Sequence, residues 1–488
     1  MIPLSDARVA TLRADLRAIG GSTCARLLRR CVELLEDATA DAESARATEC
    51  ASTAAILTDA AWEKLHTGDW KDAEPAWRDL YALATLLRVR ASATRPPRDP
   101  PASALGDSAL LHDPTAALRA LDVATLLGGP TFRSELDVAI RAAAARNARA
   151  TAAAREGSTK RHRADTEADA DADTSEEESG AFRWCIGDPD PSAATATELP
   201  PHALGVGITS PGAVPAPAAR SPVRRYEEPP SLETFLLEHF ARSSPALLVG
   251  GCACWPARTR WRDPEFLRDV AGVRTVPVEY GPDYLHPEWT QELTTVATLL
   301  RRDIRPRRAG SAARRIGYLA QHALFDQIPE LKSDVRTPDY CALSAREMGS
   351  QVEGDGVGGE GYSEERPVAT NAWLGPAGTV SPLHRDSHHG LLSQVLGRKY
   401  VRLYAPRHER AMYPRDVAKE SNASSVDLAA ERGRATLSEE TAQAFPEFAK
   451  APFLDVILEE GDQLYVPPEW WHYVQSMTSS FSVSHWWG

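Results

Sequence analysis

The sequence predicts an α+β multidomain protein: an all-α N-terminal domain, a disordered linker, and a C-terminal β-rich domain of the jelly-roll type. Three observations predict this organisation. Residues 1–155 carry apolar side chains at helical spacings, residues 156–228 are acidic and then rich in Pro and Ala, and residues 229–488 hold many short β-rich runs. The chain has 488 residues, enough for two folded domains and a linker, since one domain takes roughly 150 residues.

Composition and charge exclude several classes of protein. No apolar run approaches the ~20 residues of a membrane span, so no membrane association is expected. The first residues lack a basic start followed by an apolar run, and seven scattered cysteines do not suggest a disulfide framework. We therefore expect a protein of the nucleus, the cytoplasm or both. A net charge of -13 argues against direct binding of nucleic acid.

The N-terminal domain, residues 1–155, is rich in Ala, Leu, Arg and Glu. Its apolar residues recur at spacings of three and four, which predicts helices with core-facing stripes. No repeat of fixed period is evident, so an array of helical repeats is left open. We expect this domain to recruit other proteins. The stripes comprise Leu27, Leu28, Cys31, Leu34 and Leu35, then 54–57, then Trp77, Leu80, Tyr81, Leu83 and Leu86.

The predicted linker, residues 156–228, begins with the basic cluster Lys160, Arg161 and Arg163 and continues into an acidic tract. Such a composition buries too little apolar surface to offset the entropy of ordering, which predicts disorder. The basic cluster fits part of a nuclear-import signal, but a solvated group of charges is the simpler interpretation.

A second folded domain is expected from residue 229, with a helix that Ser231 caps at its start. The predicted strands that follow are bounded by turn residues, as in a sandwich or barrel of the jelly-roll type. The β-rich runs are 246–251, 274–281, 317–325, 369–375, 399–406, 453–467, 472–474 and 481–487.

His384 and Asp386 are two residues apart, which places both side chains on one face of an extended segment. His472, which starts the strand that follows the turn at Pro467 and Pro468, is the candidate third ligand. Two histidines and one carboxylate leave coordination positions open and suit ferrous iron in an oxygenase. A His-x-Asp pair also occurs by chance, so the pattern alone does not establish a metal site.

Lys399 extends this hypothesis. The alternation of Lys399, Val401 and Leu403 predicts that the lysine faces the interior, where an ammonium is costly unless an anion pairs with it. A carboxylate of 2-oxoglutarate would be a suitable partner. If the strand instead lay at a sheet edge, Lys399 would be solvated.

Four C-terminal runs resemble the Jumonji-C family of Fe(II)- and 2-oxoglutarate-dependent oxygenases: NAWLGPAGTVSPLHRD, GRKYVRLYAP, FPEFAKAPFLDVILEEGDQLYVPPEWWHYV and FSVSHWW. Upstream, RTVPVEYG, EWTQELTTV and IGYLAQHALFDQIPELKSDVRTPDYC extend the resemblance to about residues 230–488, whereas the first 230 residues are similar only in general character. The resemblance implies a double-stranded β-helix, or cupin-like, fold that uses Fe(II), 2-oxoglutarate and O2.

The resemblance also implies roles for individual residues. It implies that His384, Asp386 and His472 bind iron and that Lys399 anchors 2-oxoglutarate. Without the resemblance, Tyr318 would be a half-buried strand tyrosine, Ser381 a turn residue, Glu279 a surface acid and Trp373 a core tryptophan. With it, Tyr318 and Ser381 become hydroxyl donors to the co-substrate, Trp486 a wall of its pocket, and Glu279 and Trp373 the lining of the substrate pocket.

Two features depart from the family. Gly390 stands where relatives have an asparagine that contacts 2-oxoglutarate, so a weaker grip on the co-substrate is expected. His388 or His389 could replace that contact, although exposed loop histidines are the simpler expectation. The Gly- and Glu-rich segment 343–365 is long for an ordered loop and is either a lid or an inert insertion.

The leading hypothesis is hydroxylation of a protein or peptide substrate at an arginine side chain. An acid beside an aromatic plane suits a guanidinium, which favours arginine at Glu279 and Trp373. The alternative within the same oxygenase class is demethylation of N-methyl-lysine in histones. A non-enzymatic scaffold with a degenerate barrel is the alternative from another class, which the complete ligand set and Lys399 disfavour.

Overall fold

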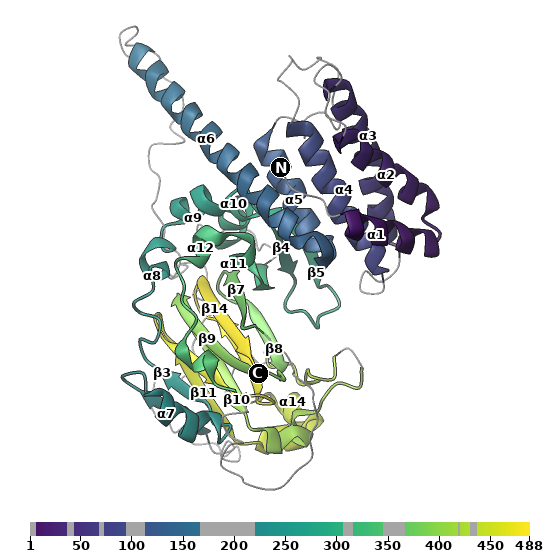
Figure 1. Cartoon of the computed structure of the whole chain (residues 1–488). Coiled ribbons are helices and arrows are strands. Elements are labelled where there is room, and N and C mark those ends of the chain that lie inside the picture. The colour runs from purple at the N-terminus through teal and green to yellow at the C-terminus, as the bar shows by residue number, and fades with distance from the viewer. Residues whose placement is uncertain are drawn as a thin grey trace. The chain divides into compact units, whose positions relative to one another are not determined.

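A computed structural model describes the chain in nine segments (Figure 1). The described residues divide into two compact units, one from Met1–Ala181 with Val273–Thr275 and one from Phe182–Gly272 with Val276–Gly488. None of the described helices is long and apolar enough to cross a membrane. The described segments are 6–36, 43–67, 73–93, 113–165, 220–305, 316–344, 367–417, 420–429 and 437–488.

The first unit is helical, as predicted. Its fifth helix begins at Pro114, and the Asp113 side chain caps it by accepting a hydrogen bond from the Thr115 N–H at 2.9 Å. This is the arrangement expected at a helix start, where the first N–H groups lack partners. The helices are α1 Asp6–Ala18, α2 Ser22–Glu36, α3 Glu43–Leu65, α4 Pro75–Ala93, α5 Pro114–Leu127 and α6 Arg133–Asp165, with a 3₁₀ turn Pro130–Phe132 before α6.

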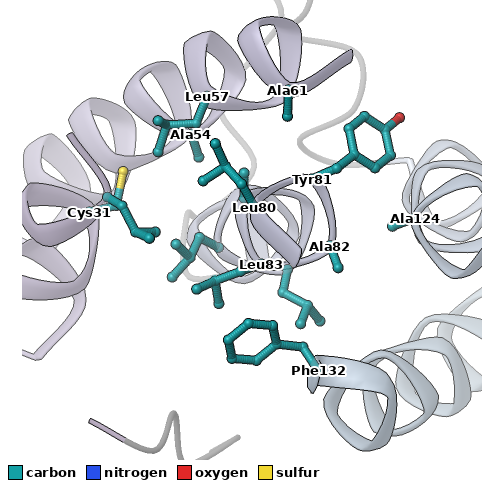
Figure 2. Packing of buried hydrophobic residues seen from close by; sticks show 14 of the residues in the cluster. Cys31, Ala54, Leu57, Ala61, Leu80, Tyr81, Ala82, Leu83, Ala124 and Phe132 are labelled. Atoms are coloured by element: carbon teal, nitrogen blue, oxygen red, sulfur yellow. The ribbon is translucent and has the colours of Figure 1, made fainter. Parts of the chain in front are cut away.

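Helix α4 is the centre of this unit. Figure 2 shows Leu80 and Leu83 of α4 among side chains of the surrounding helices, with Phe132 below them. Phe132 and Leu83 are fully buried, so the cluster is a packed core. Most of the predicted core stripes are confirmed, but Ile56 is 57% exposed, so its predicted place in the core is wrong: helix α3 turns that position away from its buried residues Ala54 and Leu57. The buried stripe residues are Leu28, Cys31, Leu34, Ala54, Leu57, Trp77, Leu80, Tyr81, Leu83 and Leu86.

The second unit contains two β-sheets, and the predicted jelly-roll class is confirmed. One sheet has five strands in the order β1-β11-β10-β13-β8, and the other has nine in the order β2-β3-β12-β9-β14-β7-β6-β4-β5. The strands are β1 Arg220–Pro222, β2 Arg224–Tyr226, β3 Ala246–Leu248, β4 Thr275–Tyr280, β5 Thr290–Thr295, β6 Gly317–His322, β7 Ala369–Gly375, β8 Val380–His384, β9 His389–Leu396, β10 Lys399–Tyr404, β11 Phe453–Leu458, β12 Gln463–Val466, β13 Trp471–Ser476 and β14 Ser480–Trp487.

Short helices accompany these sheets. The Ser231 hydroxyl accepts a hydrogen bond from the Thr234 N–H at 3.1 Å, so the predicted cap is confirmed. The α-helices are α7 Leu232–Phe235, α8 Ala257–Arg260, α9 Pro264–Ala271, α10 Val296–Leu299, α11 Leu324–Gln327, α12 Pro329–Lys332, α14 Glu439–Ala444 and α15 Pro446–Lys450. Other helical turns are the π-helical Leu236–Phe240 and Leu300–Ile304 and the 3₁₀ Asp339–Ala342 and Pro406–Met412.

The structure differs from the predicted linker, 156–228, at both ends. Helix α6 continues to Asp165, and strands β1 and β2 occupy 220–226. β1 pairs with β11, and β2 pairs with β3, so hydrogen bonding to the sheets compensates for a composition that predicts disorder. Residues 166–219 lie outside the described residues, as does most of the predicted loop 343–365. The predicted domain boundaries at 155 and 228 stay predictions.

Candidate metal and co-substrate site

Two neighbouring strands of the five-stranded sheet bring the predicted metal ligands together. β8 ends at His384, and the register of the sheet places His472 of β13 opposite it. Asp386 follows β8, with its carboxylate oxygens 4.0 Å from His384 Nε2 and 3.7 Å from His472 Nε2. One ligand atom of each residue lies within 4.8 Å of the others, so all three can reach a single ion.

Backbone carbonyl groups fix the orientation of both imidazoles. The Nδ1 atom of His384 lies 2.7 Å from the Pro382 carbonyl oxygen, and that of His472 lies 2.9 Å from the Trp470 carbonyl oxygen. Each Nδ1 therefore carries the proton, and each Nε2 is left with a lone pair directed at the shared centre. Burial lowers the pKa of His472 to about 4, which keeps the ring neutral, as metal coordination requires.

Lys399 is a buried cation beside this triad. It is only 2% exposed, on a strand that lies between β11 and β13, which excludes the edge-strand alternative. Its ammonium donates a hydrogen bond to the Tyr318 hydroxyl at 3.2 Å. Burial lowers the pKa of Lys399 to about 7. Desolvation therefore opposes the charged form of the Lys399 ammonium. An anion bound beside it would offset that cost, as expected of an anion-binding site.

An inner cavity connects Lys399 with the triad. The sequence-predicted co-substrate residues are therefore brought together, although they come from four strands, β6, β8, β10 and β14, that are distant in the sequence. The Trp373 indole donates a hydrogen bond from Nε1 to the Ser484 hydroxyl at 2.9 Å, which fixes its ring in the cavity wall. The predicted residues that line this cavity are Tyr318, Trp373, Ser381, His384, Asp386, Lys399, His472 and Trp486.

A second, outer cavity of ≈ 750 Å³ is lined by two of the three triad residues, His384 and Asp386. This volume is large enough to admit a side chain of another protein. Glu279 of β4 and Trp373 of β7 both line it, and their role in binding a substrate stays a prediction. Burial raises the pKa of Glu279 to about 7. A cationic group bound beside this carboxyl would stabilise its charged form.

The segment around Gly390 differs in part from expectation. Gly390 lies in β9 and lines the inner cavity, and a Cβ atom built on it would lie 3.5 Å from the Trp486 ring. His388 lines both cavities. His389 is not an exposed loop histidine: its Nδ1 lies 2.8 Å from the Tyr465 hydroxyl and its ring stacks on Phe240 at 4.1 Å. The alternation of β9 directs His389 away from the cavity, so it cannot replace the missing asparagine.

Sequence analysis missed several residues that line the outer cavity. Tyr284 presents its ring edge-on to His384 at 6.3 Å. Gln321 and Glu469 line the same cavity and have left-handed backbone conformations, with φ values of 46° and 64°. Arg385 stands between two predicted ligands, which is a signal that sequence analysis could have used. The conformations of Gln321 and Glu469 have no signature in the sequence, because both are ordinary polar residues.

Comparison with known proteins supplies the family. Residues 232–488 match the family described as "Cupin-like domain", and residues 20–158 match "KDM8-like, N-terminal ARM repeats". The chain is 34% identical to Lysine-specific demethylase JMJ30 of Arabidopsis thaliana, over 99% of this chain and 94% of the relative. The chain belongs to the Jumonji-C family. It is also 31% identical to Lysine-specific demethylase 8 of Danio rerio, over 98% of this chain and all of that protein. Jumonji C domain-containing protein 5 of Drosophila melanogaster is 42% identical over 53% of this chain and 58% of its own length.

The Jumonji-C membership makes the protein a 2-oxoglutarate-dependent dioxygenase that uses Fe(II), and the scaffold alternative is set aside. The residues present fit these groups, since a His-Asp-His triad and a buried ammonium line one cavity. The match to ARM repeats also answers the open question about the helical domain. Its repeats were missed because no spacing recurs regularly enough to mark a period.

Proposed function

We propose that this dioxygenase oxidises a cationic side chain of a protein substrate at the mouth of the outer cavity. The observation that carries the proposal is the partly buried carboxyl of Glu279, which lines the same cavity as Trp373, His384 and Asp386. A cation beside a carboxylate and an aromatic face is stabilised by both charge and ring. The acidic net charge of -13 also favours basic partners.

His384, Asp386 and His472 would hold the ferrous ion through two Nε2 atoms and one carboxylate oxygen. The Lys399 ammonium and the Tyr318 hydroxyl would bind the distal carboxylate of 2-oxoglutarate, with Ser381 as a further hydroxyl donor and Trp486 as a wall. When bound, these groups and O2 supply oxidation of a C–H bond, coupled to conversion of 2-oxoglutarate into succinate and carbon dioxide.

The chain's own residues contribute binding, orientation and exclusion of water. Trp373 lines both cavities, and its bond to Ser484 fixes the orientation of its ring there. Glu279 would hold the substrate cation as a carboxylate, and the cation would in turn lower the raised pKa of that group. The target carbon would thereby be held at the triad.

Two reactions satisfy this arrangement. Demethylation of N-methyl-lysine is favoured by the relatives, because those from Arabidopsis and Danio are named lysine-specific demethylases. Hydroxylation of arginine, the leading hypothesis from the sequence, is favoured by Glu279 and Trp373, because a guanidinium both pairs with a carboxylate and stacks on an indole. We rank demethylation first and keep arginine hydroxylation as the second candidate.

The test uses the purified full-length chain with Fe(II), ascorbate and 2-oxoglutarate, and measures succinate with each peptide class. Methylated lysine peptides of histones should yield formaldehyde in step with succinate. Arginine peptides should instead gain +16 Da without formaldehyde if the second reaction is the true one. If neither class raises succinate above the level of a His384→Ala variant, the proposed reaction on cationic side chains fails.

The helical unit is proposed to bind other proteins, since it matches ARM repeats, and to bring substrates to the oxygenase unit. We also propose that the protein acts in the nucleus, because histones, the substrates proposed for demethylation, are found there. Imaging of a tagged chain, with Lys160, Arg161 and Arg163 replaced by alanine in a second version, tests both the location and the role of the basic cluster. Exclusion of the unmodified chain from the nucleus would contradict the proposal.

A further inference from the structure

Glu469 holds an unusual position next to the triad. Its backbone is left-handed, with φ of 64°, although it carries a side chain. Its N–H donates a hydrogen bond to the Asp386 carbonyl oxygen at 2.7 Å, and its carboxylate accepts one from Arg385 Nη1 at 2.5 Å. Both bonds lead from the segment before His472 to the segment that carries His384 and Asp386.

Arg385 is the partner at the centre of this contact. Its guanidinium lies 3.1 Å from Glu409 and 5.4 Å from the centre of the Trp471 ring. Its backbone N–H donates to the Asn422 carbonyl oxygen at 2.9 Å, and the Asn422 amide donates back to the Arg385 carbonyl oxygen at 3.2 Å. Contacts with three other segments of the chain thereby hold Arg385 in place. Its two sequence neighbours, His384 and Asp386, belong to the triad.

A role in general stability does not account for this arrangement. The Arg385 and Glu469 side chains are 27% and 45% exposed, and surface ion pairs of that kind add little to the free energy of unfolding. A side chain in the left-handed region is also unfavourable compared with glycine. Unfavourable conformations that persist beside a functional site point to a task at that site.

We propose that Arg385 and Glu469 form a positioning clamp that fixes the spacing between the His384–Asp386 segment and His472, and so sets the affinity for the metal. The clamp rests on the triad proposed above as the metal site. Neither residue binds the ion, since each acts through the backbone and side-chain orientation of its neighbours. Residues that orient metal ligands from outside the coordination sphere typically change metal affinity by roughly tenfold to a hundredfold.

The test measures binding of Mn(II), used as an air-stable substitute for Fe(II), to the full-length chain by electron paramagnetic resonance of the free ion. Arg385→Ala and Glu469→Ala should each weaken binding by roughly tenfold to a hundredfold. Because the two side chains act as one unit, the double variant should bind no more weakly than the weaker single variant. Glu469→Gln, which keeps a hydrogen-bond acceptor, should fall between wild type and Glu469→Ala.

Glu469→Gly separates the carboxylate from the backbone. Glycine adopts φ of 64° readily and keeps the N–H bond to Asp386, but it lacks the carboxylate. We expect it to bind Mn(II) as weakly as Glu469→Ala while unfolding at the same temperature or higher. Binding at the wild-type level by Glu469→Gly would overturn the clamp, because backbone strain alone would then explain the alanine variant.

Two further variants complete the design. Arg258→Ala removes an ion pair that is somewhat less exposed, with Arg258 2.9 Å from Glu460, and that does not touch the ligand segments, so the variant should bind Mn(II) as wild type does. His472→Ala tests the triad itself. If His472→Ala keeps full affinity, the metal site is wrong; if it loses the metal while Arg385→Ala and Glu469→Ala keep it, only the clamp is wrong.

Discussion

The helical unit and the β-sheet unit bury different kinds of side chain. The apolar core around α4 consists mostly of Leu, Ala and aromatic residues, and the buried carboxylates of this unit, Asp122 and Glu135, are each paired with an arginine. In the β-sheet unit, Lys399 and His472 are also buried, although desolvation opposes the charged form of each. Burial of the apolar core of the helical unit raises the free energy of unfolding. Burial of Lys399 and His472 lowers it, and these two groups are needed only when ligands are bound.

This contrast predicts that single changes have opposite consequences in the two units. In the helical unit a truncation should reduce the free energy of unfolding and leave turnover alone. In the cavity of the β-sheet unit a change should reduce turnover and leave the free energy of unfolding equal or higher.

The largest effect is expected for His472→Ala. Loss of one of three ligands should reduce succinate formation by at least about a hundredfold, since changes in residues that only orient ligands already cost roughly tenfold to a hundredfold. The thermal unfolding of the metal-free protein should stay close to that of wild type. His66→Ala, which removes an exposed histidine of the helical unit, is the matched control and should keep full activity. Comparable activity in the two variants would refute the assigned ligand.

The next effect concerns the helical core. Phe132→Ala should lower the free energy of unfolding by about 3–5 kcal/mol, because it leaves a cavity at a fully buried position. Denaturant titration measures this loss, and kcat below the unfolding transition should be unchanged. Val138→Ala, at a side chain that is 46% exposed, should change stability by no more than about 0.5 kcal/mol. A reduced kcat in folded Phe132→Ala would show that the two units are energetically coupled.

The same contrast explains what the sequence could predict. Apolar periodicity located helices α2, α3 and α4 and eight of the strand-forming runs, because burial of one face repeats along the chain. Strand β9 was missed since His389, Gly390 and Gln394 interrupt its pattern, and those residues serve the cavity or the layer behind it. The triad and Lys399 could be predicted from spacing and family resemblance. The left-handed conformation of Glu469 could not, because it depends on the Asp386 carbonyl, which is distant in sequence.

Lys399→Met should weaken 2-oxoglutarate binding by about 2–5 kcal/mol, the usual cost of removing one member of a buried charged pair. Without co-substrate the variant should unfold at the same temperature as wild type or higher, since a buried amine whose partner is the neutral Tyr318 hydroxyl has been replaced by an apolar chain of similar length. Calorimetric titration and thermal unfolding measure the two effects. If Lys399→Met markedly destabilised the ligand-free protein, Lys399 would be a side chain that stabilises the fold, as Phe132 is.

The raised pKa of Glu279 should make the KM of a cationic substrate depend on pH. The pKa of Glu279 is raised to about 7, so its carboxylate forms as pH rises through that value. The KM of a cationic substrate should therefore fall by about tenfold for each full unit of pH below the transition, and level off above it. Glu279→Gln should have a high KM without this dependence. Steady-state kinetics from pH 6 to 8 provide the comparison, and an identical profile in both proteins would exclude Glu279 as the binding group.

The smallest effect is expected for Gly390→Asn. Gly390 is not among the glycines with positive φ, and a Cβ atom would meet nothing closer than the Trp486 ring at 3.5 Å, so the backbone and the space both permit a side chain. An asparagine amide there could donate one hydrogen bond to a carboxylate in the inner cavity, which contributes about 0.5–1.5 kcal/mol. The KM for 2-oxoglutarate should therefore fall by roughly twofold to tenfold.

Gly390→Ala separates the amide from the added volume. It should stabilise the strand by about 0.5–1 kcal/mol, because glycine loses more conformational freedom on folding, and it should leave the KM for 2-oxoglutarate unchanged. If both variants raise this KM, the empty space beside Trp486 is itself part of the co-substrate site. Gly390 would then resemble Lys399: each lowers the free energy of unfolding of the ligand-free protein and contributes to binding of the co-substrate.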